Sequence, residues 1–259
     1  MNIIYELNPP KVFLESSLNM NILNHEIDKF IDRTQIILKY VNSLHITDSV
    51  LGIPRISSLH GASLIRENIK NEKITLSCSV RTRDRNINSL IQFATQSIFL
   101  KIKDLLFIMG DKPQIYEKIV PGNLSKPTDV VTLLNSLGYN NFINLNLSIP
   151  NKILDFSNFK KKIQSNPYGL ITQSINSIEE VRDLKRVLEP YPIKLIPCIM
   201  IPSEKNDKAA KMIGLNWDEY KNDVLEFFFK IAKLVGQVLI TSPNDFSGGV
   251  ELLKKIKNY

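Results

Sequence analysis

Eight short apolar runs, each bounded by turn-forming residues, alternate along this chain with longer segments of helical periodicity. The runs read IIYEL, LHITD, ITLSCSV, DLLFIM, FINLNLS, GLITQ, IKLIPCIM and QVLITS, and their length and composition are typical of strands. Successive runs begin about 25 to 45 residues apart, which suits parallel strands joined by right-handed helical crossovers. We therefore predict an α/β fold, a (β/α)8 TIM barrel formed as a single domain by residues 1–259.

The segments between the runs carry apolar residues at helical spacing, as Leu90, Phe93, Ala94 and Ile98 do. A doubly wound open sheet would give the same alternation. It usually has fewer strands in this length, however, and its G-x-G-x-x-G turn follows none of the candidate strands. The barrel is therefore the preferred architecture, with long irregular loops expected at 110–127 and 201–220 on its active side.

Composition and termini narrow the class of protein. With 43% hydrophobic residues the chain can bury a sizeable core. No apolar run approaches the roughly 18 to 20 residues that cross a bilayer, because Lys230 and Lys233 interrupt VLEFFFKIAKLVGQVLI. The N-terminal residues lack the zones of a signal peptide. We expect a soluble, cytoplasmic protein.

Metal and nucleic acid are not expected as partners. Cys78 and Cys198 lie in apolar runs, without a second cysteine or a histidine at metal-ligand spacing, so we interpret both as buried structural thiols. The net charge of +7 could indicate nucleic-acid binding. The lysine runs at 160–162 and 254–257 nevertheless lie in helix-like segments with no aromatic residues interleaved. A basic surface would also attract an anionic cofactor.

Two acidic residues follow strand-like runs, and both have two interpretations. Glu6 precedes Asn-Pro-Pro, which ends the strand, so its carboxyl group could be a general acid if burial raises its pKa, or it could pair with an arginine of the third βα loop. Asp111 follows Gly110, where a ligand could approach the backbone, yet Asp before Lys-Pro is also a common turn former.

Other polar residues should lie at the same carboxyl end of the barrel. In RTRDRN, the arginine side chains could bind phosphate, or Asp84 could pair locally with Arg83 or Arg85. Gln173, in GLITQ, offers amide donors and an acceptor to a heterocycle. Lys162 could neutralise a phosphate or simply be solvated.

The ordered set YELNPPK, ITDSVLGIPRISSLHGASLI, RTRDRN, LLFIMGDKP and LITQ resembles methylenetetrahydrofolate reductase, most of all the reductase domain fused to a homocysteine methyltransferase in some bacteria. The resemblance runs from Glu6 to the eighth strand. It implies a barrel that binds FAD, takes a hydride from NADH or NADPH, and reduces a methylene-tetrahydrofolate or related reduced pterin, supplying methyl groups for methionine synthesis. The family commonly forms homo-oligomers.

Residue by residue, the resemblance implies that Glu6 is the general acid, that Asp111 lies near flavin and pterin, and that Gln173 holds nicotinamide or pterin. The positions that it assigns to FAD are Thr47, Arg83, Asp84, Gly110, Asp111, Thr128, Asn146, Asp155 and Lys162. The chain departs from the family at Ser79, where many members have His, and at Met109, where other bacterial reductases have Arg.

Two alternatives remain. One is a pterin-binding barrel of the methyltransferase type, which uses Glu6 and Asp111 only to hold the heterocycle and performs no redox chemistry. The other is a non-catalytic partner subunit that keeps the fold.

Overall fold

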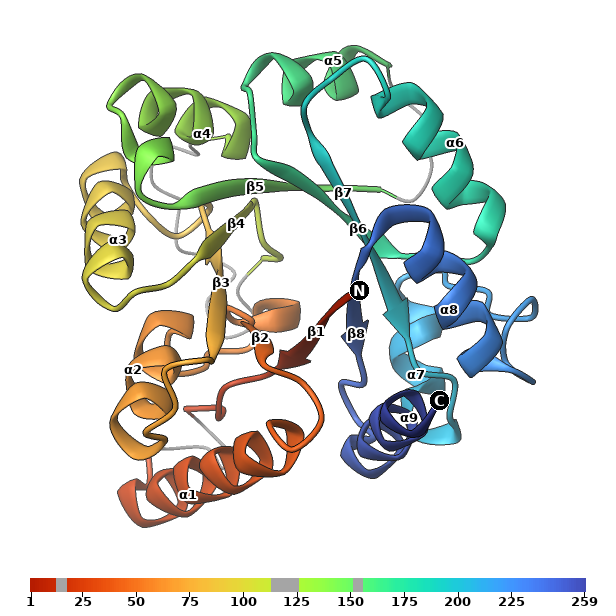
Figure 1. Ribbon diagram of the computed structural model, residues 1–259. Coiled ribbons are helices and arrows are strands. Elements are labelled where there is room, and N and C mark those ends of the chain that lie inside the picture. Colours follow the sequence, from red (N-terminus) through yellow and green to blue (C-terminus); the bar gives the residue numbers. More distant parts are fainter. Residues whose placement is uncertain (13–17, 113–125, 151–155) are drawn as a thin grey trace.

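The computed structural model describes residues 1–12, 18–112, 126–150 and 156–259. Its strands are all parallel and pair in sequence order into a closed barrel (Figure 1). They are β1 (Asn2–Leu7), β2 (Ser43–Ile46), β3 (Thr75–Arg81), β4 (Asp104–Ile108), β5 (Asn144–Ile149), β6 (Gly169–Ser174), β7 (Lys194–Met200) and β8 (Gln237–Thr241). This confirms the predicted TIM barrel and excludes the open doubly wound sheet.

Helices surround the barrel in Figure 1 and cover the outer face of the sheet. They are α1 (Met20–Ile37), α2 (Ser58–Asn68), α3 (Ile87–Phe99), α4 (Pro127–Ser136), α5 (Phe156–Gln164), α6 (Ile178–Leu188), α7 (Glu204–Met212), α8 (Val224–Val235) and α9 (Phe246–Asn258), with 3-10 turns η1 (Val50–Gly52) and η2 (Tyr139–Asn141). None of these helices is long and apolar enough to cross a membrane.

The stretch predicted as an irregular loop at 201–220 contains helix α7, so that part of the prediction was wrong. The helix begins at an N-cap, where the Ser203 side chain accepts the backbone N–H of Asn206. The cap fixes where the helix begins, although the sequence of α7 has only weak helical periodicity. In the other predicted loop, residues 113–125 lie outside the described residues.

Alternating side chains along each strand divide the apolar residues into two layers. Tyr5, Leu105 and Leu195 face the helices and belong to the large outer core. The residues that alternate with them form a separate cluster inside the barrel: Ile4, Leu106, Ile171, Ile196, Cys198 and Leu239. The outer layer holds the helices to the sheet, while the inner layer fills the lumen beneath the site.

Part of the barrel interior is polar. On β2 and β3 the residues facing inward include His45, Ser77, Ser79 and Arg81, all buried, and β5 adds Asn146. Buried polar groups are costly unless they are hydrogen-bonded, and His45 meets this need through Ser77 and Ser79, whereas the Asn146 Oδ1 atom has no hydrogen-bond partner among the described residues.

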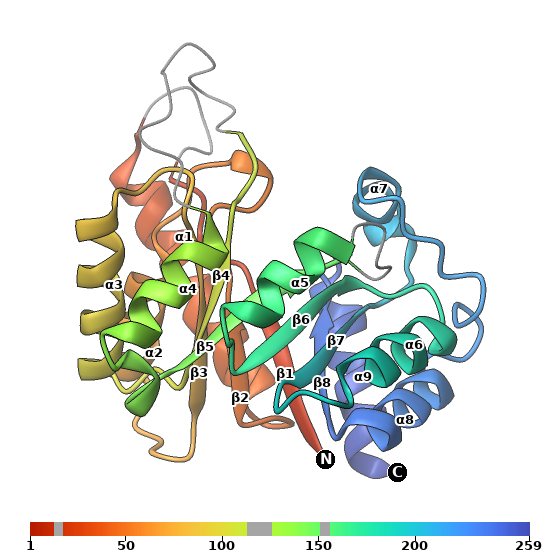
Figure 2. The ribbon, with the colours of Figure 1, turned by 90° about the horizontal axis from the view of Figure 1, so that it is seen from above.

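The two chain termini lie at the same end of the barrel, below the strands in Figure 2. Because the strands are parallel, their carboxyl ends lie together at the opposite end. The described residues that directly follow β1, β2, β3 and β4 therefore lie at one mouth, where TIM barrels carry their functional groups.

Candidate functional site

Glu6, near the carboxyl end of β1, is a mostly buried carboxyl group at the mouth. Its Oε1 accepts a hydrogen bond of 2.6 Å from the Thr241 hydroxyl of β8, the strand that closes the barrel against β1. Burial raises the pKa of Glu6, and the Thr241 hydrogen bond opposes this only partly. Within the described residues no arginine or lysine forms an ion pair with it. The predicted alternative, pairing with an arginine after β3, is therefore not what the described residues show.

Three further residues lie near the carboxyl ends of β7, β2 and β6: Cys198, Thr47 and Gln173. The buried Cys198 thiol of β7 lies inside the barrel, and burial together with the nearby Glu6 carboxylate raises its pKa. Thr47, just after β2, donates to the Asn8 side-chain oxygen at 2.7 Å and so links the first two βα loops. Gln173 is exposed at the end of β6, beside a bulge where the Thr172 hydroxyl accepts the backbone N–H of Cys198 at 2.9 Å.

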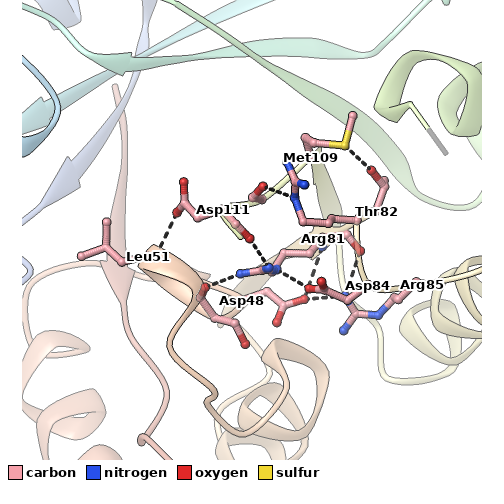
Figure 3. A network of polar contacts seen from close by, with 11 residues as sticks. Asp48, Leu51, Arg81, Thr82, Asp84, Arg85, Met109 and Asp111 are labelled. Carbon is pink, nitrogen blue, oxygen red and sulfur yellow. Dashed lines mark hydrogen bonds and ion pairs between the residues drawn. The ribbon is translucent and has the colours of Figure 1, made fainter. Parts of the chain in front are cut away.

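A network of charged groups joins the loops that follow β2, β3 and β4 (Figure 3). Arg81, the last residue of β3, pairs with Asp84 at 2.7 Å, and Arg85 pairs with the buried Asp48 at 2.7 Å. Asp84 therefore pairs within RTRDRN, but its partner is Arg81, so the two predicted partners, Arg83 and Arg85, were wrong. Arg83 donates from Nε to the Gly110 carbonyl at 2.9 Å.

Asp111 lies at the edge of this network with an exposed side chain. Its Oδ2 accepts the backbone N–H of Leu51 at 3.1 Å, and its carbonyl accepts a hydrogen bond from Arg81. Gly110 precedes it with a φ of +81°, a conformation that glycine adopts without strain. Asp111 therefore caps a neighbouring loop as it stands, and its exposed carboxylate still reaches solvent at the mouth.

The remaining predicted cofactor residues that the structure describes each have a different local environment. The Lys162 ammonium donates to the Ser148 carbonyl of β5, and burial lowers its pKa. Thr128, in the first turn of α4, donates to neighbouring Asp129. Asn146 is buried inside the barrel. Asp155 lies outside the described residues.

Whether these residues could bind FAD depends on the hydrogen bonds that they already make within the protein. Among the described residues, the cations that could face its diphosphate already donate to carbonyl or carboxylate oxygens: Arg81, Arg83, Arg85 and Lys162. In Arg81 the Nε, Nη1 and Nη2 atoms all have acceptors, whereas the hydrogen bonds described for Arg83 and Lys162 use only part of their donors, so a phosphate could approach those two without displacing an internal acceptor. The FAD and NAD(P)H assignments therefore stay predictions of the resemblance, and the geometry adds no support to them.

Sequence reasoning missed His45, which it treated as an isolated histidine. It is 2% exposed inside the barrel, and its Nδ1 and Nε2 lie 2.8 Å from the hydroxyl oxygens of Ser77 and Ser79. It is also the register partner of Glu6 across the β1–β2 ladder. The signal was present as polar residues at every second position of SLHIT and TLSCSVR, a period-two pattern that marks one face of a strand.

The barrel resembles a solved enzyme of pteroate synthesis. The crystal structure of 7,8-dihydropteroate synthase from Vibrio fischeri ES114 matches with a TM-score of 0.53 and 10% sequence identity, over 99% of this chain and 92% of that one. At this identity the likeness shows the fold alone. No family model matches the chain, and no curated protein does.

This comparison corrects the functional prediction. The resemblance implied a flavin-dependent reductase that transfers a hydride, whereas the solved structure reported above is a 7,8-dihydropteroate synthase. The prediction of a flavin reductase is corrected on this finding, and no finding supports the oxidoreductase class. The alternative given with it, a pterin-binding barrel without redox chemistry, agrees better with this solved structure.

Proposed function

We propose that this chain is a pterin-binding barrel enzyme that catalyses group transfer without a redox step, and that it holds its heterocycle at the mouth of the barrel through Glu6. The likeness to 7,8-dihydropteroate synthase supports the fold and the pterin class of ligand. The observation that carries the proposal is the Glu6 carboxyl group, which is mostly buried, is bound to Thr241 and has a raised pKa.

A pterin ring suits this group for a chemical reason. One edge of the ring carries an amino group and a ring N–H side by side, and a carboxylate can accept both hydrogen bonds at once. The mostly buried Glu6 carboxyl group accepts a hydrogen bond from Thr241 and pairs with no cation among the described residues, so such a ligand would supply further donors. Thr241 holds one carboxylate oxygen in place and orients the other.

The two acidic residues at the mouth have separate roles in this proposal. Glu6 binds and orients the heterocycle from inside the barrel. Asp111 lies on the β4 loop with an exposed carboxylate, where it can accept a hydrogen bond from the ligand as well as from Leu51. Gln173, exposed near the end of β6, offers amide donors and an acceptor.

Binding of tetrahydrofolate, followed by calorimetry, tests the proposal. We expect saturable binding by the wild-type protein and a loss of affinity of about tenfold or more in Glu6→Gln, because Gln keeps the shape and the Thr241 contact but loses the charge that accepts two donors. Glu251→Gln, on the exposed face of α9, is the matched control and should bind as the wild type does. Equal affinity in wild type and Glu6→Gln would remove Glu6 from the site.

The dependence of affinity on pH gives a second, independent prediction. The pKa of Glu6 is raised in the free protein, so part of the population is protonated at a pH where an ordinary glutamate is ionised. If the ionised form accepts the pterin donors, the affinity should rise as the pH rises through the Glu6 pKa and then level off, whereas Glu6→Gln should give a flat profile. An affinity that falls with rising pH would instead assign the protonated acid to binding.

An absorption spectrum separates this proposal from the flavin chemistry that the motifs implied. Protein incubated with FAD and desalted should show no change in flavin absorbance when tetrahydrofolate is added, because a group-transfer site has no flavin to reduce. Bleaching of a bound flavin by the reduced pterin would overturn the proposal.

A further inference from the structure

The guanidinium group of Arg81 joins three loops at the mouth of the barrel. Its side chain is 2% exposed. Nε donates to Asp84 at 2.7 Å, Nη1 to the Ser49 carbonyl at 2.6 Å and Nη2 to the Asp111 carbonyl at 2.5 Å. Figure 3 shows these contacts converging on one side chain. The planar fork of arginine suits this task, since it presents donors in several fixed directions.

One of the loops that Arg81 holds has a strained backbone. Ser49 has a φ of 43° and Leu51 a φ of 59°, both in the left-handed region that residues with side chains rarely adopt. Such residues are strained and persist only where the surrounding structure enforces them. Here the Ser49 carbonyl is bound by Arg81, and the Leu51 amide is bound by Asp111 Oδ2.

The contact between Arg81 and the β4 loop is close enough to require glycine. A Cβ atom on Gly110 would lie 2.8 Å from Arg81 Nε and 2.9 Å from its Cγ. The loop therefore passes directly over the Arg81 side chain, and this contact fixes the position of the backbone at Asp111. Asp48 completes the arrangement, because its carboxylate accepts the Arg81 backbone N–H at 3.3 Å and pairs with Arg85.

We propose that Arg81 is a positioning residue for the mouth of the barrel: it holds the strained segment 48–52 and the start of the β4 loop together, so that the Asp111 carboxylate is presented to the ligand. The ligand part of this inference rests on the proposed function. Asp111 is bound to the segment through one oxygen, Oδ2, and a carboxylate can accept a ligand N–H at its other oxygen. Arg81 itself need not touch the ligand.

Arg81→Lys tests the inference, because lysine keeps the charge but lacks the fork. We expect the variant to fold, by circular dichroism, while hydrogen exchange of the Leu51 and Gly52 amides becomes about tenfold faster or more and tetrahydrofolate affinity falls about tenfold. Arg186→Lys, on the exposed face of α6, should change neither measurement. If Arg81→Lys does not fold, Asp84→Asn keeps an acceptor oxygen but removes the negative charge that pairs with Arg81, and it should give the same two changes at smaller size.

The two measurements separate the possible failures. Unchanged amide exchange in Arg81→Lys or Asp84→Asn would show that Arg81 does not hold segment 48–52 in place, whether or not the protein binds a pterin. Faster exchange with wild-type affinity for tetrahydrofolate would overturn the positioning role. If the wild-type protein binds no tetrahydrofolate, the proposed function and the ligand part of the inference both fail, and amide exchange alone then decides whether Arg81 orders segment 48–52.

Discussion

Lowering the pH from 6.5 to about 4 is expected to remove about 3 kcal/mol of folding free energy through a single residue, His45. Burial in the barrel lowers the pKa of its imidazole from 6.5 to about 4. Between these values the unfolded chain binds a proton at this histidine and the folded chain does not. Protonation therefore favours unfolding, so the contribution is full above pH 6.5 and is lost as the pH falls toward 4.

The hydrogen bonds of His45 explain why the folded state keeps it neutral. The Ser77 hydroxyl also donates to the Leu44 carbonyl at 3.2 Å, so toward Nδ1 it acts as acceptor. This assigns the proton to Nδ1 and leaves Nε2 to accept from the Ser79 hydroxyl. A second proton on Nε2 would force the Ser79 hydroxyl to become the acceptor of that bond and would place a charge in a dry interior.

Urea unfolding at several pH values between 7 and 4 measures the effect as a difference between the wild type and His45→Gln. The difference is needed because Glu6 and Asp104, whose pKa values are raised, act with the opposite sign. His25→Gln, at an exposed position on α1, serves as the control and should keep the wild-type slope. A His45→Gln variant with the same pH dependence as the wild type would contradict the assignment.

Gly249→Ala is expected to destabilise the fold by about 2 kcal/mol, although alanine favours helices. Gly249 lies in the first turn of α9, and a Cβ atom there would lie 2.0 Å from the Tyr5 hydroxyl oxygen and 3.0 Å from its ring carbon Cζ. Tyr5 is buried on β1 next to Glu6, so it cannot swing away. The strand or the helix must move, and a shift of β1 would displace Glu6.

A double-mutant cycle with Tyr5→Phe checks this explanation. Removing the hydroxyl should cut the cost of Gly249→Ala to less than about 1 kcal/mol, since the shortest contact is gone. Thermal unfolding of the four proteins gives the coupling free energy. Additive effects of the two substitutions would show that the phenol does not limit this position.

Local sequence patterns were sufficient for the architecture. The outward residues of the strands, such as Leu105 and Phe107, and the stripe of Leu90, Phe93 and Ala94 on α3 are buried as their periodicity predicts. Such a pattern shows which face of one helix or strand is apolar, and this can be read from residues that are close together in the sequence. Helix α7 escaped prediction because its buried face is small, with only Asn206 and Ala210 buried.

The sequence alone determined that strands and helices alternate in the number that closes a barrel. It also determined that polar residues such as Glu6, Arg81 and Asp111 lie at or just beyond the carboxyl ends of strands. Only the tertiary structure decided which groups meet. Glu6 and Thr241 are 235 positions apart and become partners because barrel closure sets the register of β1 against β8. Arg81 binds three loops, and His45 sits between two serines, because side chains from separate strands must satisfy one another where water cannot reach.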